Sequence, residues 1–181
     1  MHRHNILACY CNIARQSLRL LLLALLWHVM PALAVDAEVG KPAPSFTATT
    51  LQNEKFSLAE QNGKVTIIHY WATWCASCRE EMPIIESYYK EHQNEGLVIL
   101  AVSIDETSDL AEVNKVMKSY SFPAAMVTNA KARGYGRIWR VPLTFVVDRQ
   151  GVLRENGWFS KTNLDRASLE KMVTPLIKSA H

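Results

Sequence analysis

Two cysteines separated by two residues, Cys75 and Cys78, carry the clearest chemistry in this sequence. The β-branched and aromatic run Val65–Trp71 before them predicts a buried strand, and residues 79–92 after them have apolar side chains at helical spacing. A Cys-x-x-Cys pair that opens a helix after a strand is a redox site more often than any other kind of site. Residues i and i+3 share one helix face, so the second sulfur can reach the first.

The positions of the two thiols on the helix predict different roles. Cys75 lies at the helix N-terminus, where unpaired amides and the helix dipole stabilise a thiolate, so we expect it to be the nucleophile. Cys78, one turn later, is expected to resolve the mixed disulfide. Ala76 and Ser77 add no charge between them, so we expect a couple that is more reducing than oxidising.

Neither a metal nor a separate cofactor is expected beside this pair. A structural zinc ion needs four ligands, and the chain after residue 34 offers only three histidines and no further cysteine. The redox-active group is therefore expected to be the Cys75–Cys78 disulfide itself.

The first 34 residues have the composition of a secretory signal peptide. Arginines precede an apolar run from Leu20 to Met30, Pro31 interrupts it, and Ala32–Ala34 offers a small-x-small cleavage pattern. The run is shorter than the ~20 residues that span a bilayer as a helix, and an uncleaved N-terminal anchor is the alternative. In both cases residues 35–181 are expected to form an exported domain in the periplasm.

The exported domain is expected to be electrically neutral. The three arginines of the first 34 residues account for the whole formal net charge of +3, so residues 35–181 give no case for nucleic-acid binding. Their number suits one ordinary hydrophobic core without internal repeats or a second domain. We expect a monomer.

The elements that must position the cysteines alternate between strands and helices, and a hairpin and a helix end the chain. A helix is expected from an N-cap at Ser108 to about Tyr120, and another from a capping box of Thr162 and Asp165 to about Ile177. This order predicts an α/β sandwich of three layers with a mixed sheet. The strands are expected at 46–50, 55–58, 65–71, 97–103, 122–128, 144–147 and 152–158.

Three motifs resemble one known family. They are Trp71–Pro83 around the cysteines, Val102–Asp105, and Val141–Asp148 with Gly151. In order and spacing they resemble the exported thiol-disulfide oxidoreductases of the TlpA/ResA kind, which include cytochrome c maturation reductases. The resemblance covers nearly all of residues 35–181. It implies a thioredoxin-like three-layer α/β/α sandwich with a mixed central sheet and an added N-terminal strand pair.

The resemblance also implies a substrate-binding surface beside the cysteines. Val141–Pro142 would be the cis-proline junction that pairs with the substrate backbone, whereas the sequence alone shows only that Pro142 keeps Val141 extended. Trp74 would flank the active site and contact the substrate, and core packing is the alternative for this residue. The segment 137–140, which ends at Arg140, could form one wall of a partner-binding groove; relatives often have glycine at that last position.

His69 departs from the family pattern, because it stands six residues before Cys75, where relatives usually carry a buried Asp, Asn or Glu that moves protons. Strand alternation places it on one face with Ile67 and Trp71. We therefore expect it to be buried and neutral, with a lowered pKa. Two interpretations stay open: a core histidine satisfied by a neighbouring carbonyl, or a proton relay for Cys78. Glu80 and Glu81 could perturb the thiols, but they are expected on a solvated helix face.

The expected function is reduction of specific protein disulfides by dithiol exchange. The resemblance implies cysteine pairs of apocytochrome c, or copper-site proteins of respiratory oxidase assembly, as substrates. It also implies a membrane dithiol donor of the DsbD or CcdA type as the electron source.

Three alternatives compete with the reductase. A disulfide-forming oxidant of the DsbA type normally carries a large helical insertion, for which residues 97–134 leave little room. A peroxiredoxin would need threonine where Ala72 stands. A Cu(I) metallochaperone would suit two soft thiolates, but copper-delivering relatives add a distant histidine and wider cysteine spacing.

Overall fold

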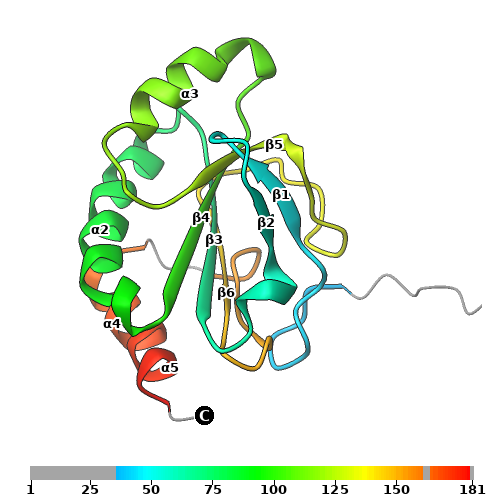
Figure 1. The fold of residues 1–181 in the computed structure, drawn as a ribbon, viewed down its shortest axis with the longest axis vertical. Helices are drawn as coiled ribbons and strands as arrows, with labels where there is room; N and C mark the ends of the chain where they lie inside the picture. Colours follow the sequence, from blue (N-terminus) through cyan, green and yellow to red (C-terminus); the bar gives the residue numbers. More distant parts are fainter. Residues whose placement is uncertain (1–35, 161–163, 180–181) are drawn as a thin grey trace, which may run out of the picture. The chain divides into compact units, whose positions relative to one another are not determined.

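One mixed β-sheet forms the frame of the domain in the computed structural model, which describes residues 36–160 and 164–179 (Figure 1). Its strands in these residues are β1 (Thr47–Thr50), β2 (Lys55–Ser57), β3 (Val65–Trp71), β4 (Leu97–Ser103), β5 (Ala124–Lys131), β6 (Leu143–Val147) and β7 (Leu153–Asn156). The strand order is β2-β1-β5-β4-β3-β6-β7. The pairs β3–β4 and β4–β5 are parallel and the other pairs are antiparallel. The predicted α/β class, mixed sheet and N-terminal strand pair are therefore confirmed.

The α-helices cover one face of this sheet (Figure 1). Met82 of α2, Val113 of α3 and Leu169 of α4 share one apolar core with the β3 residues Ile67 and Trp71. The helical segments of the described chain are η1 (Leu58–Gln61), α2 (Ala76–His92), η2 (Gln93–Glu95), η3 (Thr107–Asp109), α3 (Leu110–Met117), α4 (Arg166–Met172) and α5 (Thr174–Lys178).

The opposite face is covered mainly by irregular chain and by the 3-10 helix η1. Phe46, Tyr135 and Phe145 pack edge to face in this second core, together with Leu58 of η1. The Tyr135 hydroxyl donates a hydrogen bond to the Pro44 carbonyl at 3.0 Å, which ties the lead-in to the loop before β6. Because the buried Tyr135 hydroxyl has this hydrogen-bond partner, it is not left unsatisfied in the core.

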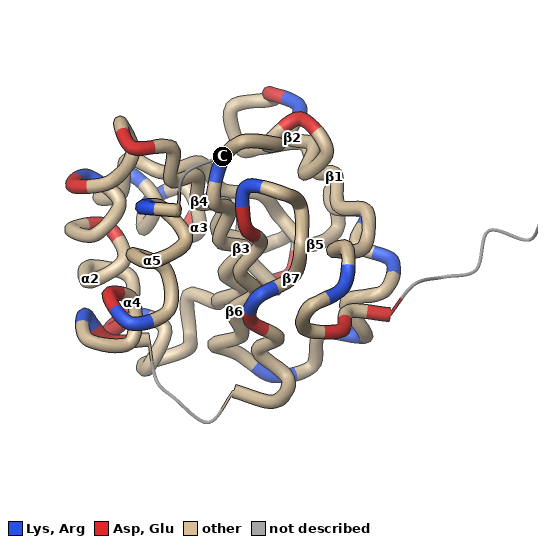
Figure 2. The backbone as a smooth tube through the Cα atoms, turned by 90° about the horizontal axis from the view of Figure 1, so that it is seen from below, with Lys and Arg blue, Asp and Glu red and all other residues tan. Residues whose placement is uncertain are grey.

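The strands β3 and β4 begin and end where the sequence predicts. Every residue of β3 is buried, and so is all of β4 except Val98. The sequence of a strand buried on both faces is a continuous apolar run. The strand therefore ends where the first polar turn residues appear in the sequence. Figure 2 shows the charged residues of both signs spread along the helices and loops around these central strands.

The predicted N-cap at Ser108 is wrong. Ser108 lies inside η3, and α3 begins after Asp109, whose side chain makes no capping hydrogen bond. The helix also ends at Met117 rather than near Tyr120. The Tyr120 amide donates to the Met117 carbonyl three residues back, so the chain tightens into a 3-10 turn there.

Helix α4 is capped by Asp165 with Ser168, each side chain binding the other residue's backbone amide. Thr162, which the sequence pairs with Asp165, lies outside the described residues. Pro175 stands in the first turn of α5, where its missing amide costs nothing, and the predicted single helix is divided into α4 and α5.

The predicted signal peptide, residues 1–34, also lies outside the described residues. Within the described part of the chain, no helix is both long and apolar enough to cross a membrane. The lead-in that follows lies along β7: the Ala43 amide donates to the Gly151 carbonyl, and the Leu153 amide donates to the Lys41 carbonyl, at 2.8 and 2.9 Å.

Candidate active site

The cysteine pair lies where the parallel strands β3 and β4 end. Trp71, the last residue of β3, is paired with Ser103, the last residue of β4. The chain then passes through a short loop, in which the Cys75 amide donates to the Ala72 carbonyl at 3.2 Å, and enters α2. Cys75 is the N-cap of α2 and Cys78 lies in its first turn, as the sequence predicts.

The two sulfurs are joined as a disulfide. The Cys78 amide donates to the Cys75 Sγ at 3.2 Å, and the Ser77 Oγ lies 3.6 Å from the same sulfur. Both cysteines are buried, and Cys78 has no exposed surface at all. A sulfur that accepts an amide at a helix N-terminus is stabilised as a thiolate. This is the environment that a nucleophilic Cys75 requires.

Asp105 anchors the loop that carries Cys75. Its carboxylate accepts hydrogen bonds from the Thr73 amide at 3.0 Å, from the Thr73 hydroxyl at 2.6 Å and from the Ser103 hydroxyl at 2.7 Å. Asp105 is buried, so these donors replace the water that would otherwise solvate its charge. The sequence shows Asp105 only as part of a family motif, because its partner Thr73 lies 32 residues away.

His69 is completely buried in β3, as predicted. Its Nδ1 is hydrogen-bonded to the Thr144 Oγ1 of β6 at 2.9 Å, and its Nε2 has no hydrogen-bond partner among the described residues. Burial lowers the pKa of His69 from 6.5 to about 4, so the ring is neutral at pH 7. Its partner is therefore a hydroxyl rather than the backbone carbonyl that the core interpretation supposes.

The predicted substrate-binding residues lie beside the cysteine helix. The Val141–Pro142 peptide bond is cis, as the resemblance implies. Both residues are half-buried and immediately precede β6, which pairs with β3. The Trp74 side chain is 67% exposed, so the alternative of core packing is wrong for this residue.

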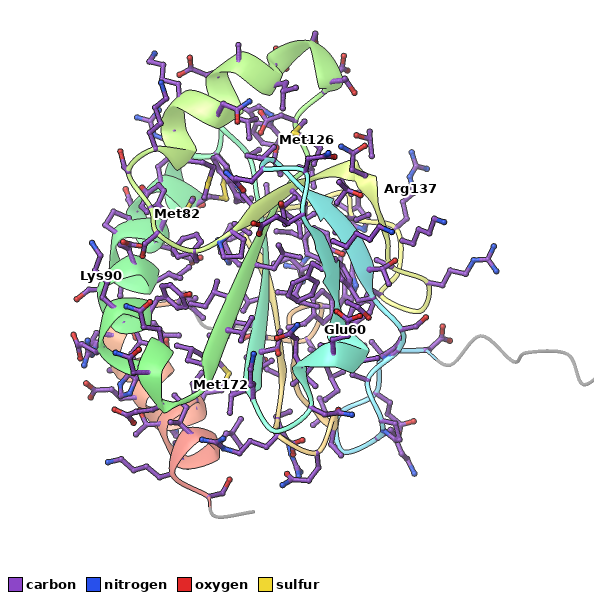
Figure 3. All side chains as sticks on the ribbon, viewed as in Figure 1. Glu60, Met82, Lys90, Met126, Arg137 and Met172 are labelled. Atoms are coloured by element: carbon purple, nitrogen blue, oxygen red, sulfur yellow. A yellow bond between two sulfur atoms is a disulfide. The ribbon has the colours of Figure 1, made fainter. Side chains whose placement is uncertain are left out.

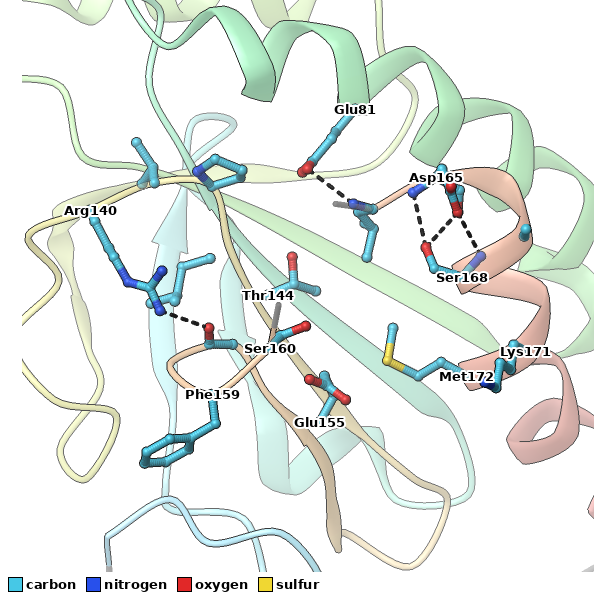
Figure 4. A pocket seen from close by; sticks show the side chains of 16 residues that line it. Glu81, Arg140, Thr144, Glu155, Phe159, Ser160, Asp165, Ser168, Lys171 and Met172 are labelled. Carbon is cyan, nitrogen blue, oxygen red and sulfur yellow. Dashed lines mark hydrogen bonds between the residues drawn. The ribbon is translucent and has the colours of Figure 1, made fainter. Parts of the chain in front are cut away.

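The predicted solvated position of Glu81 is wrong. Glu80 is exposed as predicted, but Glu81 is only 5% exposed, and its Oε1 accepts a hydrogen bond from the Leu164 amide at 3.0 Å (Figure 4). Burial raises the pKa of Glu81, and the Leu164 amide partly opposes that shift. No local pattern could reveal this burial, because Leu164 lies 83 residues away.

A hollow of about 1200 Å³ separates Glu81 from the turn that follows β7. Its walls come from α2, the cis-proline segment, the turn after β7 and α4 (Figure 4). Pro142 and Val141 line it on one side, and Arg140 and Phe159 line it farther out. The cis-proline segment thus borders open space next to the first turns of the cysteine helix.

Comparisons with known proteins agree on one family. Residues 39–156 match the model of the AhpC/TSA family. The chain is 32% identical over 139 residues to the thiol-disulfide oxidoreductase ResA of Bacillus thuringiensis, covering 76% of this chain and 80% of that protein. It is 30% identical over 123 residues to the thioredoxin-like protein YneN of Bacillus subtilis, covering 67% and 72% of the two chains.

The fold matches solved structures of the same kind. A thiol:disulfide interchange protein of the thioredoxin family from Chlorobium tepidum aligns with a TM-score of 0.65 at 28% identity, covering 79% of this chain and 99% of that chain. The expected thioredoxin-like fold is therefore confirmed.

Replacing Asp105 by alanine should destabilise the domain. Asp105→Ala leaves the Thr73 amide and the Ser103 hydroxyl without their buried acceptor, so we expect a loss of about 2–4 kcal/mol in the free energy of unfolding. Urea denaturation of the oxidised protein measures it. Asp109→Ala, at an exposed residue of η3, is the control and should cost less than about 0.5 kcal/mol. Equal losses in the two variants would contradict the anchoring role.

Protonation of His69 should weaken the fold in acid. Its pKa is 6.5 in the unfolded chain and about 4 when folded, so the unfolded state binds more protons between these values and stability rises with pH there. We expect the free energy of unfolding to fall by up to roughly 3 kcal/mol between pH 6.5 and pH 4. In His69→Asn this part of the slope should disappear. Urea denaturation across the pH range tests it, and parallel slopes in both proteins would refute it.

Proposed function

We propose that this chain, which belongs to the AhpC/TSA family and is a thiol-disulfide oxidoreductase, reduces specific protein disulfides in the periplasm. One observation carries the proposal: a disulfide joins the helix N-cap Cys75 to the fully buried Cys78, next to a cis-proline segment that borders open space. Of the two cysteines only Cys75 keeps exposed surface, 6%, so it is the one that a partner's sulfur can approach, and Cys78 lies behind it to complete the exchange.

The reaction is a transfer of two electrons through one mixed disulfide. The Cys75 thiolate of the reduced protein attacks one sulfur of the substrate disulfide, and the other substrate sulfur leaves as a thiolate and takes up a proton. Cys78 then loses its proton and attacks the Cys75 sulfur. The Cys75–Cys78 disulfide forms, and the second substrate thiol is released. A membrane dithiol of the DsbD or CcdA type would return the electrons.

The surface beside Cys75 supports a protein substrate. Trp74 is exposed next to the nucleophile, and neither the amide nor the carbonyl of Val141 makes a backbone hydrogen bond within the described residues. An extended substrate strand can satisfy these groups and lie against Pro142. We propose as substrates the cysteine pairs of apocytochrome c or copper-site proteins of respiratory oxidase assembly.

The connection between β4 and β5 supports a reductase over an oxidant of the DsbA type. In the described chain this connection holds only η3 and the eight residues of α3, whereas such oxidants normally carry a large helical domain there. The loop before Cys75 also argues against peroxide chemistry, because Ala72 provides no hydroxyl.

His69 is the candidate for moving the proton of Cys78. Strand alternation puts its ring on the face of β3 that α2 covers, where Cys78 packs with Trp71 and Ile67. In the tautomer whose Nδ1 donates to the Thr144 Oγ1, the unpartnered Nε2 can accept a proton, and the lowered pKa keeps the ring neutral until then. A neutral core histidine without this role is the competing interpretation.

Trapping tests the proposed function. Cys78→Ser leaves Cys75 able to attack but removes the thiol that releases the substrate, so we expect the full chain with this substitution to accumulate covalent complexes in bacterial cells. Non-reducing electrophoresis and mass spectrometry would identify the partners. The double variant Cys75→Ser/Cys78→Ser is the control and should trap nothing. If the single variant also traps nothing, dithiol exchange with proteins is not the function.

The proposed proton relay through His69 is tested by measuring the attack of Cys78 on a mixed disulfide of Cys75. A mixed disulfide between Cys75 and glutathione is prepared, and its breakdown by Cys78 is followed by stopped flow from pH 5 to pH 9. With a relay, His69→Asn should slow breakdown by about 10²-fold below the pKa of Cys78, since positioned bases contribute 10²–10⁴. His92→Asn, the same substitution at the far end of α2, should leave the profile unchanged. An unchanged profile for His69→Asn would exclude the relay.

A further inference from the structure

Exposed aromatic side chains lie near the cis-proline segment in the chain and in the wall of the hollow. Among the described residues, five large apolar side chains are exposed, and Trp139 and Phe159 are the most exposed of them at 72% and 80%. Trp139 precedes the cis-proline segment by two residues, and Phe159 follows β7. A cluster of exposed aromatic rings is costly in water and marks an interaction surface more often than chance.

Trp158 contacts Trp139 directly and precedes Phe159 in the chain. Its ring stacks on the Trp139 ring, with 5.9 Å between centroids and an angle of 29°. Its Nε1 donates to the Tyr135 carbonyl at 2.6 Å, and a side chain at Gly136 would meet that nitrogen at 3.1 Å. We call Trp139, Trp158 and Phe159 the aromatic platform.

Arg140 fixes the platform rather than offering a free charge. Its guanidinium donates to the carbonyls of Gly157 and Trp158 at 3.2 and 2.8 Å, and lies 5.4 Å from the Trp158 ring and 6.0 Å from the Trp139 ring. From the sequence, this arginine is expected in one wall of a partner-binding groove. The structure shows that it clamps two segments together, so the rings are preorganised and a partner need not order them.

The platform is continuous with the cis-proline segment. Arg140 and Phe159 line the same hollow as Pro142 (Figure 4). Gly157 holds the turn against β6 so closely that an added Cβ would lie 2.6 Å from the Thr144 amide nitrogen. A polypeptide whose disulfide meets Cys75 and whose backbone follows Pro142 would therefore reach the platform next.

The loop that leads to the platform is basic. Residues 131–140 contain four Lys or Arg and no Asp or Glu. Lys131, Arg133 and Arg137 are exposed and form no ion pair among the described residues. Arg137 projects away from the sheet (Figure 3). Two acidic residues, Asp36 and Glu38, flank Ala37, whose amide donates to the Gly134 carbonyl of this loop, and the three exposed cations of the loop outnumber them.

We propose that the aromatic platform and this basic loop bind an acidic segment of the substrate polypeptide, with an apolar side chain on the rings and carboxylates at Arg133 and Arg137. The proposal rests on the proposed function and adds the substrate class that the site selects. A small ligand does not fit the observations, because rings this exposed are covered only by a macromolecule. Complementary charge would act chiefly on the rate of encounter, which makes the selection sensitive to salt.

Two synthetic peptides test it. Both hold a Cys-Ala-Ala-Cys disulfide followed by leucine; one is flanked by three glutamates and the other by three lysines. The protein, reduced and freed of reductant, is mixed with each peptide under single-turnover conditions, and reduction is followed by acid quench and chromatography. At about 20 mM salt we expect the acidic peptide to react about tenfold faster, and at about 300 mM the ratio should approach one.

Reversing the charges of the basic loop tests whether this loop causes the preference for the acidic peptide. Arg133→Glu/Arg137→Glu should abolish or invert the preference, and Trp139→Ser should slow the acidic peptide by at least threefold. The control Lys64→Glu/Lys178→Glu makes the same change in charge at exposed residues near the other end of β3 and should keep the preference. A preference that survives the first reversal would overturn the proposal.

Two further outcomes separate the sources of failure. If the wild type reduces neither peptide, the proposed reductase function fails; if it reduces both equally at low salt, only the acidic-substrate proposal fails. A last experiment measures binding of the protein to vesicles of phosphatidylglycerol and phosphatidylethanolamine by sedimentation. Vesicle binding that needs Arg133 and Arg137, without any peptide preference, would assign the basic loop to a lipid surface and overturn the proposal.

Discussion

The pairing of β3 with a strand on each side is the constraint on which the site depends. β4 runs parallel to β3 and β6 runs antiparallel. The carboxyl ends of β3 and β4 and the amino end of β6 therefore meet at one edge of the sheet. That edge brings together the cysteine loop, Asp105 and the cis-proline segment, which are separated by 30 residues or more in the sequence. No flexible loop has to close to assemble them.

The same pairing buries β3 on both faces, and this decides how its polar residues behave. A charged His69 would lose its hydration in the core, so the neutral ring is favoured and one hydroxyl, that of Thr144, is its partner. Asp105 lies just beyond the end of β4, where amide and hydroxyl donors from the neighbouring loop can reach a carboxylate. The strand interior thus favours a neutral ring, whereas the end of β4 offers several hydrogen-bond donors to a carboxylate.

The sequence predicts what depends on local pattern and misses what depends on distant contacts. β3, β4 and the start of α2 follow from a buried apolar run and a Cys-x-x-Cys spacing, which are local signals. The burial of Glu81 depends on Leu164, and the anchoring of Thr73 depends on Asp105. The prediction of an N-cap at Ser108 was wrong for a related reason. Ser108 lies in the 3-10 helix η3, and the propensity of serine for N-caps does not distinguish a 3-10 turn from the start of an α-helix.

The residues that hold the cysteine pair and those that hold the aromatic platform are structurally separate. The cysteine pair is held by β3, Asp105 and the first turn of α2, whereas the aromatic platform is held by Arg140, Gly157 and the Tyr135 carbonyl. The two sets share the edge formed by β6 but no side-chain hydrogen bond within the described residues. If the platform binds the substrate as proposed, substitutions in the loop before Pro142 would alter which polypeptide reaches Cys75 and leave the hydrogen-bond donors around its sulfur in place.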